Sequence, residues 1–247
     1  MPRFFFSPHA VCADGQIALS GDDARHIASS LRMRPGDLLV LCDGGGTDYH
    51  CVLRAVSPLA VTAAVEKSAR SMAEPDVQVT LFIALAKGDK TETVVQKAVE
   101  LGVHAIAPFL SERCISRPDS EAGRKKQLRL QKIADEAASQ CGRGILPAVF
   151  PIRSFADAVT SAARADKALF LYENERRTGL KSILSEGRPK TLSLMTGPEG
   201  GFAPAEALFA RDAGLIAVSM GPRILRCETA PLAALAAAML MTGNLGQ

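Results

Sequence analysis

The apolar residues of this chain fall into two arrangements, one before and one after the polar connector at residues 68–75. Before it, short apolar runs alternate with turns. Residues 38–42 form a compact run that ends in one aspartate and three glycines, and residues 49–53 resume it, which predicts a β-hairpin. Residues 61–65 predict a further strand. Residues 21–32 begin with helix-capping residues and place apolar side chains four apart, which predicts a short helix in an otherwise β-rich module.

After the connector the apolar runs become nearly continuous. Residues 77–86 and 103–110 are typical of strands that are buried on both faces. Helical segments at 89–102 and 117–140 separate or follow them. Because strands alternate with helices, this part predicts an α/β fold with a parallel sheet. Three more buried strands are predicted at residues 168–172, 191–195 and 216–220, and a closing helix runs on from Ala230.

The change of pattern predicts two domains, at residues 1–72 and 73–247. The first helix of the second domain begins at Asp89, and Glu92 follows three residues later. This spacing predicts a capping box, in which each residue satisfies a free backbone N–H group of the other.

Composition narrows the class of protein. The chain has 247 residues, 47% of them hydrophobic and 22% charged, which favours a folded chain over a disordered one. A net charge of +3 does not by itself point to nucleic acid. The apolar tract at residues 230–241 is too short to span a bilayer, and the N-terminus is too interrupted for a signal peptide, so we expect a soluble cytoplasmic protein.

The cysteines are scattered and show no C-x-x-C spacing, and the chain has only four histidines. This pattern argues against a structural metal site and against a disulfide framework, and it favours free thiols in a reducing compartment. The six cysteines are Cys12, Cys42, Cys51, Cys114, Cys141 and Cys227.

Two glycine-containing loops near the C-terminus carry the candidate chemistry. The first, at residues 195–202, has neither the lysine of a P-loop nor the dinucleotide fingerprint. It holds Glu199 and a proline without an N–H group, so its expected ligand is neutral or cationic. Its glycines let the backbone approach a ligand closely. S-adenosyl-L-methionine, with its sulfonium and ammonium groups, suits such a loop.

The second loop, at residues 220–231, is richer in charge. Arg223 and Arg226 lie three apart, and Glu228 follows at the expected entry to the last helix. The arginines and the positive end of the helix would together hold a phosphate or stabilise negative charge that develops on a base. A structural Arg–Glu pair at the start of the helix is the alternative, and it stays open at this point.

Together the two loops resemble the paired signature of the SPOUT methyltransferases, and within them the bacterial 16S rRNA uridine-N3 methyltransferases. The ordered matches at residues 87–90, 95–103 and 136–143, with Arg3, Asp23, His26 and residues 31–37 near the start, extend the resemblance over most of the chain. Two departures are visible. Cys227 stands in place of a usual threonine, and Thr91 and Thr93 stand among residues that are more often bulky.

The resemblance implies a C-terminal SPOUT domain with a deep trefoil knot and an N-terminal PUA-like β-barrel that holds RNA. It implies a homodimer whose active site forms at the subunit interface. The implied reaction is methylation of N3 of one uridine in the decoding region of 16S rRNA, in the 30S subunit. Two alternatives remain: a non-catalytic RNA-binding or assembly factor, and a methyltransferase acting on tRNA or another rRNA site.

The resemblance also assigns residues. Arg226, helped by Arg223, would stabilise the uridine anion, and Glu199 or Glu228 would take the N3 proton. The alternative for Glu228 is that it only orients Arg226. Basic residues of the first module and of the long helix would contact RNA. A solvated helix face is the alternative for the long helix, and the first module is open to the same alternative because its basic and acidic residues balance. The residues expected to bind S-adenosylmethionine are Leu171, Thr196, Gly197, Pro198, Gly200, Met220, Gly221, Ile224, Leu225, Thr229 and Ala230. Those expected to contact RNA are Arg3, Arg25, Arg32, Arg34, Lys90, Arg124, Lys125 and Arg129.

Overall fold

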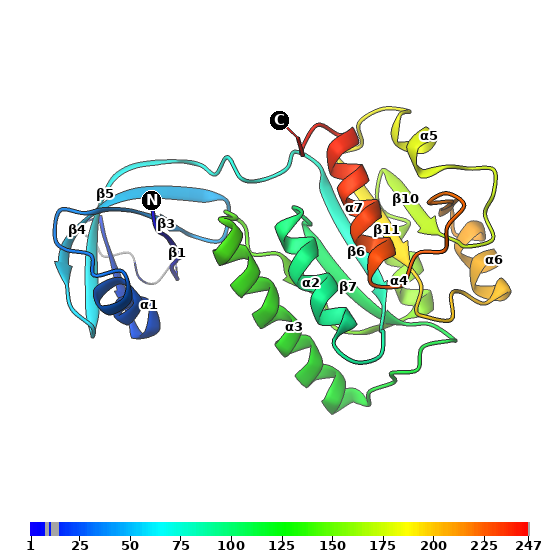
Figure 1. Cartoon of the computed structure of the whole chain (residues 1–247), viewed down its shortest axis with the longest axis horizontal. Coiled ribbons are helices and arrows are strands. Elements are labelled where there is room, and N and C mark those ends of the chain that lie inside the picture. Colours follow the sequence, from blue (N-terminus) through cyan, green and yellow to red (C-terminus); the bar gives the residue numbers. More distant parts are fainter. Residues whose placement is uncertain (8–9, 11–14, 247) are drawn as a thin grey trace. The chain divides into compact units, whose positions relative to one another are not determined.

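A computed structural model describes residues 1–7, 10 and 15–246. The chain divides into two compact units (Figure 1). The first comprises Met1–Glu74 and Ala138–Leu146, and the second comprises Pro75–Ala137 and Pro147–Gln247. Cys12 lies outside the described residues. The described cysteines, from Cys42 to Cys227, are free thiols, as the sequence predicts.

The first unit is built on a five-stranded sheet with the order β1-β3-β4-β5-β2. Its central strands β3, β4 and β5 pair antiparallel, which confirms the predicted hairpin and the further strand, while β1 pairs parallel with β3. Register shifts interrupt the β4–β5 ladder at two points, and such bulges bend a sheet. The strands are β1 (Arg3–Phe5), β2 (Gln16–Ser20), β3 (Leu38–Cys42), β4 (Thr47–Val56) and β5 (Ala60–Arg70).

The predicted helix of this unit is confirmed, but it changes geometry along its length. An α-helical turn, α1 (Gly21–Arg25), continues as the π-helix η2 (His26–Ser30). Ile27 is fully buried and holds the helix on the unit's apolar core. The chain leaves the helix through Arg32, whose φ of 51° is the one positive φ of a non-glycine residue among the described residues.

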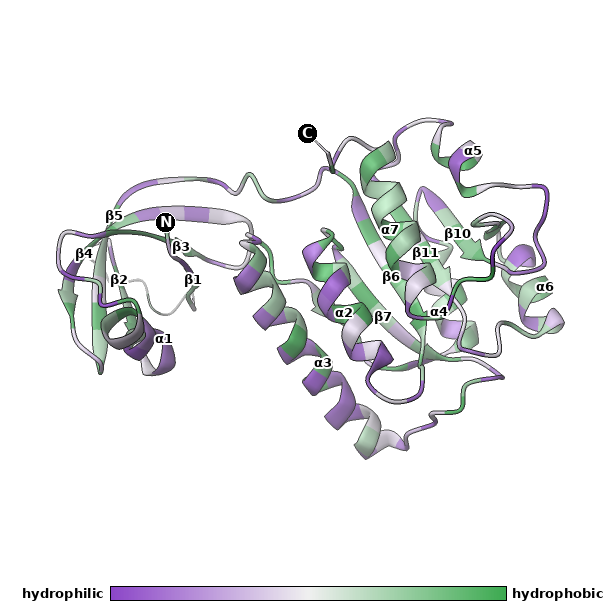
Figure 2. Cartoon of the chain, in the orientation of Figure 1, coloured by the Kyte–Doolittle hydropathy of each residue, from purple (hydrophilic) through white to green (hydrophobic). Residues whose placement is uncertain are grey.

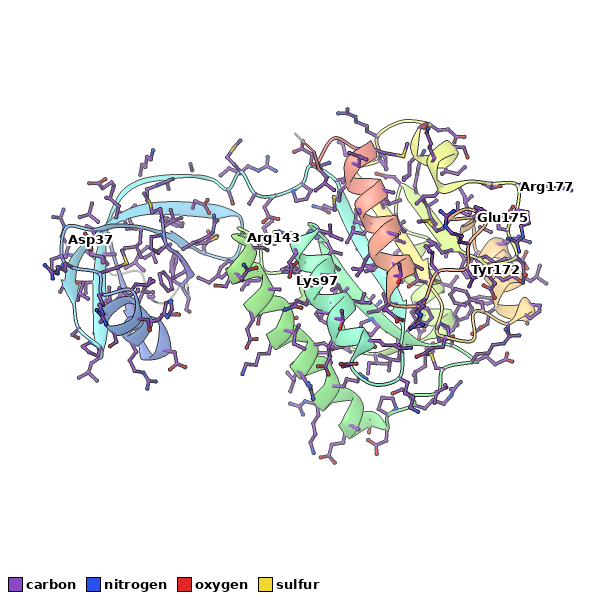
Figure 3. All side chains as sticks on the ribbon, in the orientation of Figure 1. Asp37, Lys97, Arg143, Tyr172, Glu175 and Arg177 are labelled. Atoms are coloured by element: carbon purple, nitrogen blue, oxygen red, sulfur yellow. The ribbon has the colours of Figure 1, made fainter. Side chains whose placement is uncertain are left out.

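A distant segment, residues 138–146, completes the first unit. The carbonyl of Gly144 accepts hydrogen bonds from the Gly46 N–H (3.0 Å) and the Cys42 thiol (3.0 Å). Arg143, labelled in Figure 3 just beyond α3, forms an ion pair with Glu74, and only 4% and 6% of the two side chains are exposed. The end of one long helix is therefore fastened to the chain that enters the second unit.

The second unit is built on a parallel sheet, as the sequence predicts. Its strand order is β12-β10-β11-β6-β7-β8, with β9 paired beside β7, and every strand pair in it is parallel. The strands predicted as buried on both faces are buried along most of their length. They are β6 (Gln78–Ala84), β7 (Ala105–Leu110), β8 (Ala148–Val149), β9 (Arg153–Ser154), β10 (Lys167–Leu171), β11 (Thr191–Thr196) and β12 (Ile216–Val218).

Helices cover this sheet. One apolar cluster joins α4 and α6 to strand residues such as Phe82 and Phe170. Within this cluster the ring centroids of Phe202 and Phe170 are 4.4 Å apart. Helix α7 packs on β6 and β11 and against α2 (Figure 1). The helices are α2 (Lys90–Glu100), α3 (Ser120–Cys141), α4 (Phe155–Ala162), α5 (Leu180–Leu184), α6 (Pro204–Asp212) and α7 (Thr229–Met241).

Two predictions about helix starts are wrong. The capping box at Asp89 does not form, because Asp89 has φ −90° and ψ 0° rather than an extended backbone, and Glu92 instead pairs with Arg129 of α3 (2.8 Å). The long helix begins at Ser120 and not at residue 117. The carboxylate of Asp119 caps it by accepting the Ala122 N–H (2.8 Å).

Candidate functional site

The candidate site lies where three neighbouring parallel strands end. Strands β12, β10 and β11 are adjacent in the sheet and point the same way, so the loops that follow them meet at one edge. There they enclose a cavity of about 600 Å³, within the range of small-molecule sites. Lys90, at the start of α2, also lines this cavity.

The cavity brings together all four residues predicted to be catalytic: Glu199, Arg223, Arg226 and Glu228. It also contains every residue predicted to bind the methyl donor except Thr229, which does not line it. Lys90, which the sequence predicts as an RNA contact, also lines this cavity. The site residues predicted from the sequence do not include six further lining residues: Tyr172, Glu173, Gly201, Val218, Ser219 and Cys227. Tyr172, Val218 and Ser219 lie within the predicted strands, and Glu173 directly follows one of them.

The loop after β11 is held from several sides. The carboxylate of Glu199 accepts the Lys87 N–H (3.0 Å) and a hydrogen bond from Lys90 Nζ (3.2 Å). The Arg113 guanidinium donates to the Gly200 carbonyl (2.9 Å). Gly201 has φ 65° and lies so close to Glu173 that a Cβ atom there would stand 2.2 Å from a carboxylate oxygen. Only glycine leaves room for the Glu173 carboxylate at the cavity wall.

Charge interactions shift the pKa of Glu199. Partial burial raises it, but hydrogen bonds from the N–H groups of Glu199 and Lys87 and from the Lys90 ammonium outweigh burial. The pKa therefore lies below its ordinary value, and the carboxylate is ionised at neutral pH.

The loop before α7 combines an exposed cation with a held carboxylate. The side chain of Arg226 is 83% exposed, and its nearest guanidinium nitrogen is 4.0 Å from a Glu228 oxygen. Glu228 accepts a hydrogen bond from the Cys227 thiol (3.2 Å), and its own N–H group and this bond lower its pKa. Burial, with the neighbouring carboxylates, raises the pKa of Cys227 to about 12, so this thiol is not a nucleophile at neutral pH.

The rim after β10 is braced by Tyr172 and Glu175, which Figure 3 shows near Arg177. The Tyr172 ring stacks on Phe170 (5.5 Å between centroids), and the Arg211 guanidinium lies 5.8 Å from its centroid. Glu175 accepts the N–H groups of Arg177 and Thr178, and it pairs with Arg211 (3.2 Å). These contacts fix the segment that carries Glu173 to the cavity.

The other residues predicted to contact RNA fall into two groups, those that form an ion pair within the protein and those for which none is found. Arg3 is largely buried and pairs with Asp48, while Lys125 and Arg129 pair with Glu121 and Glu92. Arg25 forms an exposed pair with Asp22. The side chains of Arg32, Arg34 and Arg124 are exposed, and no ion pair of theirs is found in the described part of the chain.

Comparison with known families shows which family this chain belongs to. The profile of an RNA methyltransferase domain matches residues 73–239, which contain the whole cavity. The chain belongs to this RNA methyltransferase family. The profile of an RNA methyltransferase PUA domain also matches residues 19–66, so a domain of this family stands at the N-terminus.

Members of the family that resemble this chain have a common name. A protein of Bacillus subtilis named ribosomal RNA small subunit methyltransferase E is 36% identical over 92% of this chain and 90% of its own length. A protein of the same name from Mycobacterium bovis is 32% identical over 93% of this chain and 88% of its own length.

A solved structure extends the comparison to the fold. The crystal structure of ribosomal RNA small subunit methyltransferase E from Neisseria gonorrhoeae, bound to S-adenosyl methionine, is 34% identical to this chain. It matches with a TM-score of 0.85, over 97% of each chain. In the described part of this chain, no helix is both long and apolar enough to cross a membrane.

Proposed function

We propose that this protein transfers a methyl group from S-adenosylmethionine to N3 of one uridine in the decoding region of 16S rRNA, within the 30S subunit. The proposal depends on one observation: the loops at residues 195–202 and 220–231, which differ in charge, line the same cavity. A glycine loop with an anchored carboxylate faces a loop with two arginines. The relatives' shared name and the cofactor in the Neisseria structure support the choice of RNA substrate and methyl donor.

The residues of the cavity fit the methyl donor. Leu171, Val218 and Leu225 supply apolar surface for an adenine ring. Glu173 brings a carboxylate to the same cavity, suited to ribose hydroxyls or to the cationic part of the ligand. When bound, S-adenosylmethionine supplies an electrophilic methyl group on a positively charged sulfur.

The acceptor side must deal with the proton on uridine N3. Once that proton leaves, negative charge spreads onto O2 and O4 of the base. Arg226, exposed at the cavity and only loosely paired, is placed to stabilise this charge, with Arg223 beside it. Glu199 and Glu228, both ionised at neutral pH, are the two candidates for taking the proton.

The homodimer is part of this proposal. After Thr229, helix α7 has no polar residue as far as Met241, and Figure 2 shows it without a hydrophilic stripe. A helix that is apolar all round is normally buried on all sides. The side chain of Leu240 is nevertheless 60% exposed, and a second copy of the chain would cover this face. Sedimentation of the protein alone tests this part.

The domain roles and the finer fold complete the proposal. Residues 1–72 form a PUA-like barrel that holds RNA, and the bulges between β4 and β5 support a sheet curved enough to close. Residues 73–247 form the methyl-transfer domain, with a deep trefoil knot at its C-terminal end. Pulling the chain from both termini tests the knot, because a tightened knot retains residues and shortens the extended length.

Mass-spectrometric mapping of methyluridine in small-subunit rRNA, with and without this protein, tests the function. One N3-methyluridine that disappears when the protein is removed, and returns when purified protein and S-adenosylmethionine are added, is the expected result. A methyl group found on tRNA or at another rRNA position would show that the substrate differs from the one proposed. Binding to RNA without any binding of S-adenosylmethionine would instead indicate an assembly factor.

A further inference from the structure

Lys90 occupies an unusual place for a cation. It is the first residue of α2, where the helix dipole presents partial positive charge and favours acidic side chains. A lysine at this end is stabilised only if nearby anions offset the dipole. Two carboxylates do so: Glu199 lies 3.2 Å from the Lys90 ammonium and Glu228 lies 3.8 Å from it.

The turn that carries Lys90 is itself anchored. Gly88 has φ 72°, which lets the chain reverse between β6 and α2. The buried hydroxyl of Thr91 accepts the Ala86 N–H (3.3 Å), and this fixes the base of the turn. The turn donates two hydrogen bonds to the Glu199 carboxylate, from the Lys87 N–H group and from Lys90 Nζ. The Lys90 ammonium is thus presented from a rigid support.

The two carboxylates belong to different loops. Glu199 is part of the glycine loop after β11, and Glu228 closes the arginine loop before α7. The Lys90 ammonium joins them across the cavity. We propose that Lys90 is a positioning residue that ties the donor loop to the acceptor loop by pairing with one glutamate of each.

This role differs from the RNA contact that the sequence predicts for Lys90. A phosphate that approached Lys90 would also approach Glu199 and Glu228, whose negative charges repel it. The side chain of Lys90 is only 34% exposed, whereas that of Arg226, on the same cavity, is 83% exposed. The accessible cations for RNA at this cavity are therefore Arg223 and Arg226, and Lys90 acts through the two carboxylates.

The charged groups around Lys90 define its effect on pH dependence. Glu199 faces it from the glycine loop. Glu228 and Cys227 face it from the other loop, and Arg226 lies beside Glu228. The attraction of Lys90 lowers the pKa of both glutamates. Loss of the Lys90 charge therefore raises the pKa of Glu199 and Glu228. Because the proposed activity needs ionised carboxylates, the variant should lose activity at a higher pH than wild type when the solution is acidified.

The test compares Lys90→Met, which keeps the apolar stem and removes the charge, with Lys90→Arg and with Lys97→Met. Lys97 is a matched control, because it lies on the same helix (Figure 3) and pairs with Glu100 (2.8 Å), and neither residue lines the cavity. Hydrogen exchange of the free protein is measured first, since it needs neither methyl donor nor RNA. Lys90→Met should speed exchange in residues 197–201 and 226–229, and the other two variants should not.

Binding and kinetics follow. This inference rests on the proposed function where it concerns methyl transfer. For Lys90→Met we expect roughly threefold to tenfold weaker binding of S-adenosylmethionine by calorimetry, in line with the loss of two partly exposed ion pairs. The acid limb of the pH profile of kcat/KM should move to higher pH. Lys90→Arg should restore both properties.

The outcomes separate the two proposals. Unchanged exchange in both loops of Lys90→Met overturns the inference, whatever the enzyme does. If wild-type protein neither binds S-adenosylmethionine nor methylates rRNA, the proposed function fails, while the exchange result still decides the link between the loops. The slope of log RNA affinity against log salt concentration counts the phosphates that the protein neutralises. If this slope falls by about one in Lys90→Met while cofactor binding is unchanged, Lys90 is a phosphate contact and the inference is wrong.

Discussion

The ion pair between Glu74 and Arg143 predicts that Glu74→Ala is among the most damaging single substitutions in the first unit. The Glu74 carboxylate accepts hydrogen bonds from Arg143 Nε (2.9 Å) and Nη2 (2.7 Å). It also accepts the N–H groups of Gly144 (2.7 Å) and Ile145 (3.0 Å). One side chain thus holds the segment after α3 against the chain that follows β5.

The expected cost follows from burial. Removal of one partner from a buried ion pair costs about 3–5 kcal/mol, because the other charge stays buried without a counter-charge. Only 4% of the Arg143 side chain is exposed, so it cannot reach solvent without moving the loop. Two backbone N–H groups also lose their acceptor, which favours the upper part of this range. A typical domain has a stability of only about 5–15 kcal/mol, so the loss is a large share of it.

Urea unfolding, followed by circular dichroism and by hydrogen exchange in the peptides of β3 to β5, measures this loss. The matched control is Glu121→Ala, which removes an exposed pair with Lys125 and should cost less than about 1 kcal/mol. If Glu74→Ala lowered the free energy of unfolding by no more than the control does, the argument from the buried pair would be refuted.

The same carboxylate predicts a pH dependence. Burial alone would raise the pKa of Glu74, but the hydrogen bonds and charge of Arg143 and the two N–H groups lower it below its ordinary value of 4.5. Its contribution is therefore complete above pH 4.5 and is lost as the pH falls towards the lowered value. Glu74→Gln, which cannot titrate, should show a flatter loss of stability with acid than wild type over this interval.

Three further substitutions test the site and the first unit. Gly201→Ala should weaken binding of S-adenosylmethionine in calorimetry, because the new Cβ atom displaces the Glu173 carboxylate. The control is Gly214→Ala. Gly214 also has a positive φ (93°) but has open space around it, so this variant introduces backbone strain alone. Equal affinities in the two variants would contradict this. Arg32→Gly should leave the stability unchanged or raise it by up to about 1 kcal/mol, because relief of the left-handed strain exceeds the extra entropy of glycine in the unfolded chain. RNA affinity should fall in the same variant, and a fall in stability would argue against the strain. Arg226→Ala should lower single-turnover methylation by at least tenfold with little change in cofactor affinity, and an unchanged rate would exclude its role in stabilising the uridine anion.

Much of the architecture was predictable because it depends on local pattern. A strand buried on both faces needs mostly apolar residues. Residues 77–86 are apolar except for Gln78 and Thr80, and residues 191–195 carry Leu192, Leu194 and Met195 beside two small polar residues. Parallel strands bring their carboxyl ends to one edge, so the two loops rich in glycine and charge had to meet there. The meeting of Glu199 and Arg226 in one cavity follows from these two facts.

The failures concern features that depend on tertiary partners. Asp89 and Glu92 have the spacing of a capping box, yet Glu92 pairs with Arg129, which is 37 positions away along the chain. Glu173 has no local signature, and only the close approach of Gly201 gives it a place at the cavity. The short strands β8 and β9 have two residues each, too few to produce a periodic pattern.

The basic residues show why charge alone is a weak predictor of RNA contacts. In the sequence, Arg3, Lys90, Arg124 and Arg32 are equivalent cations. In the structure, Arg3 is bound to Asp48 and Lys90 to two glutamates, so a phosphate would have to replace an existing counter-charge at each of them. Arg32 and Arg124 are exposed, and they have no such pair to give up within the described residues. A cation that loses nothing on binding contributes its full attraction to the phosphate, so the salt dependence of RNA binding should come mainly from the unpaired subset of the predicted contacts.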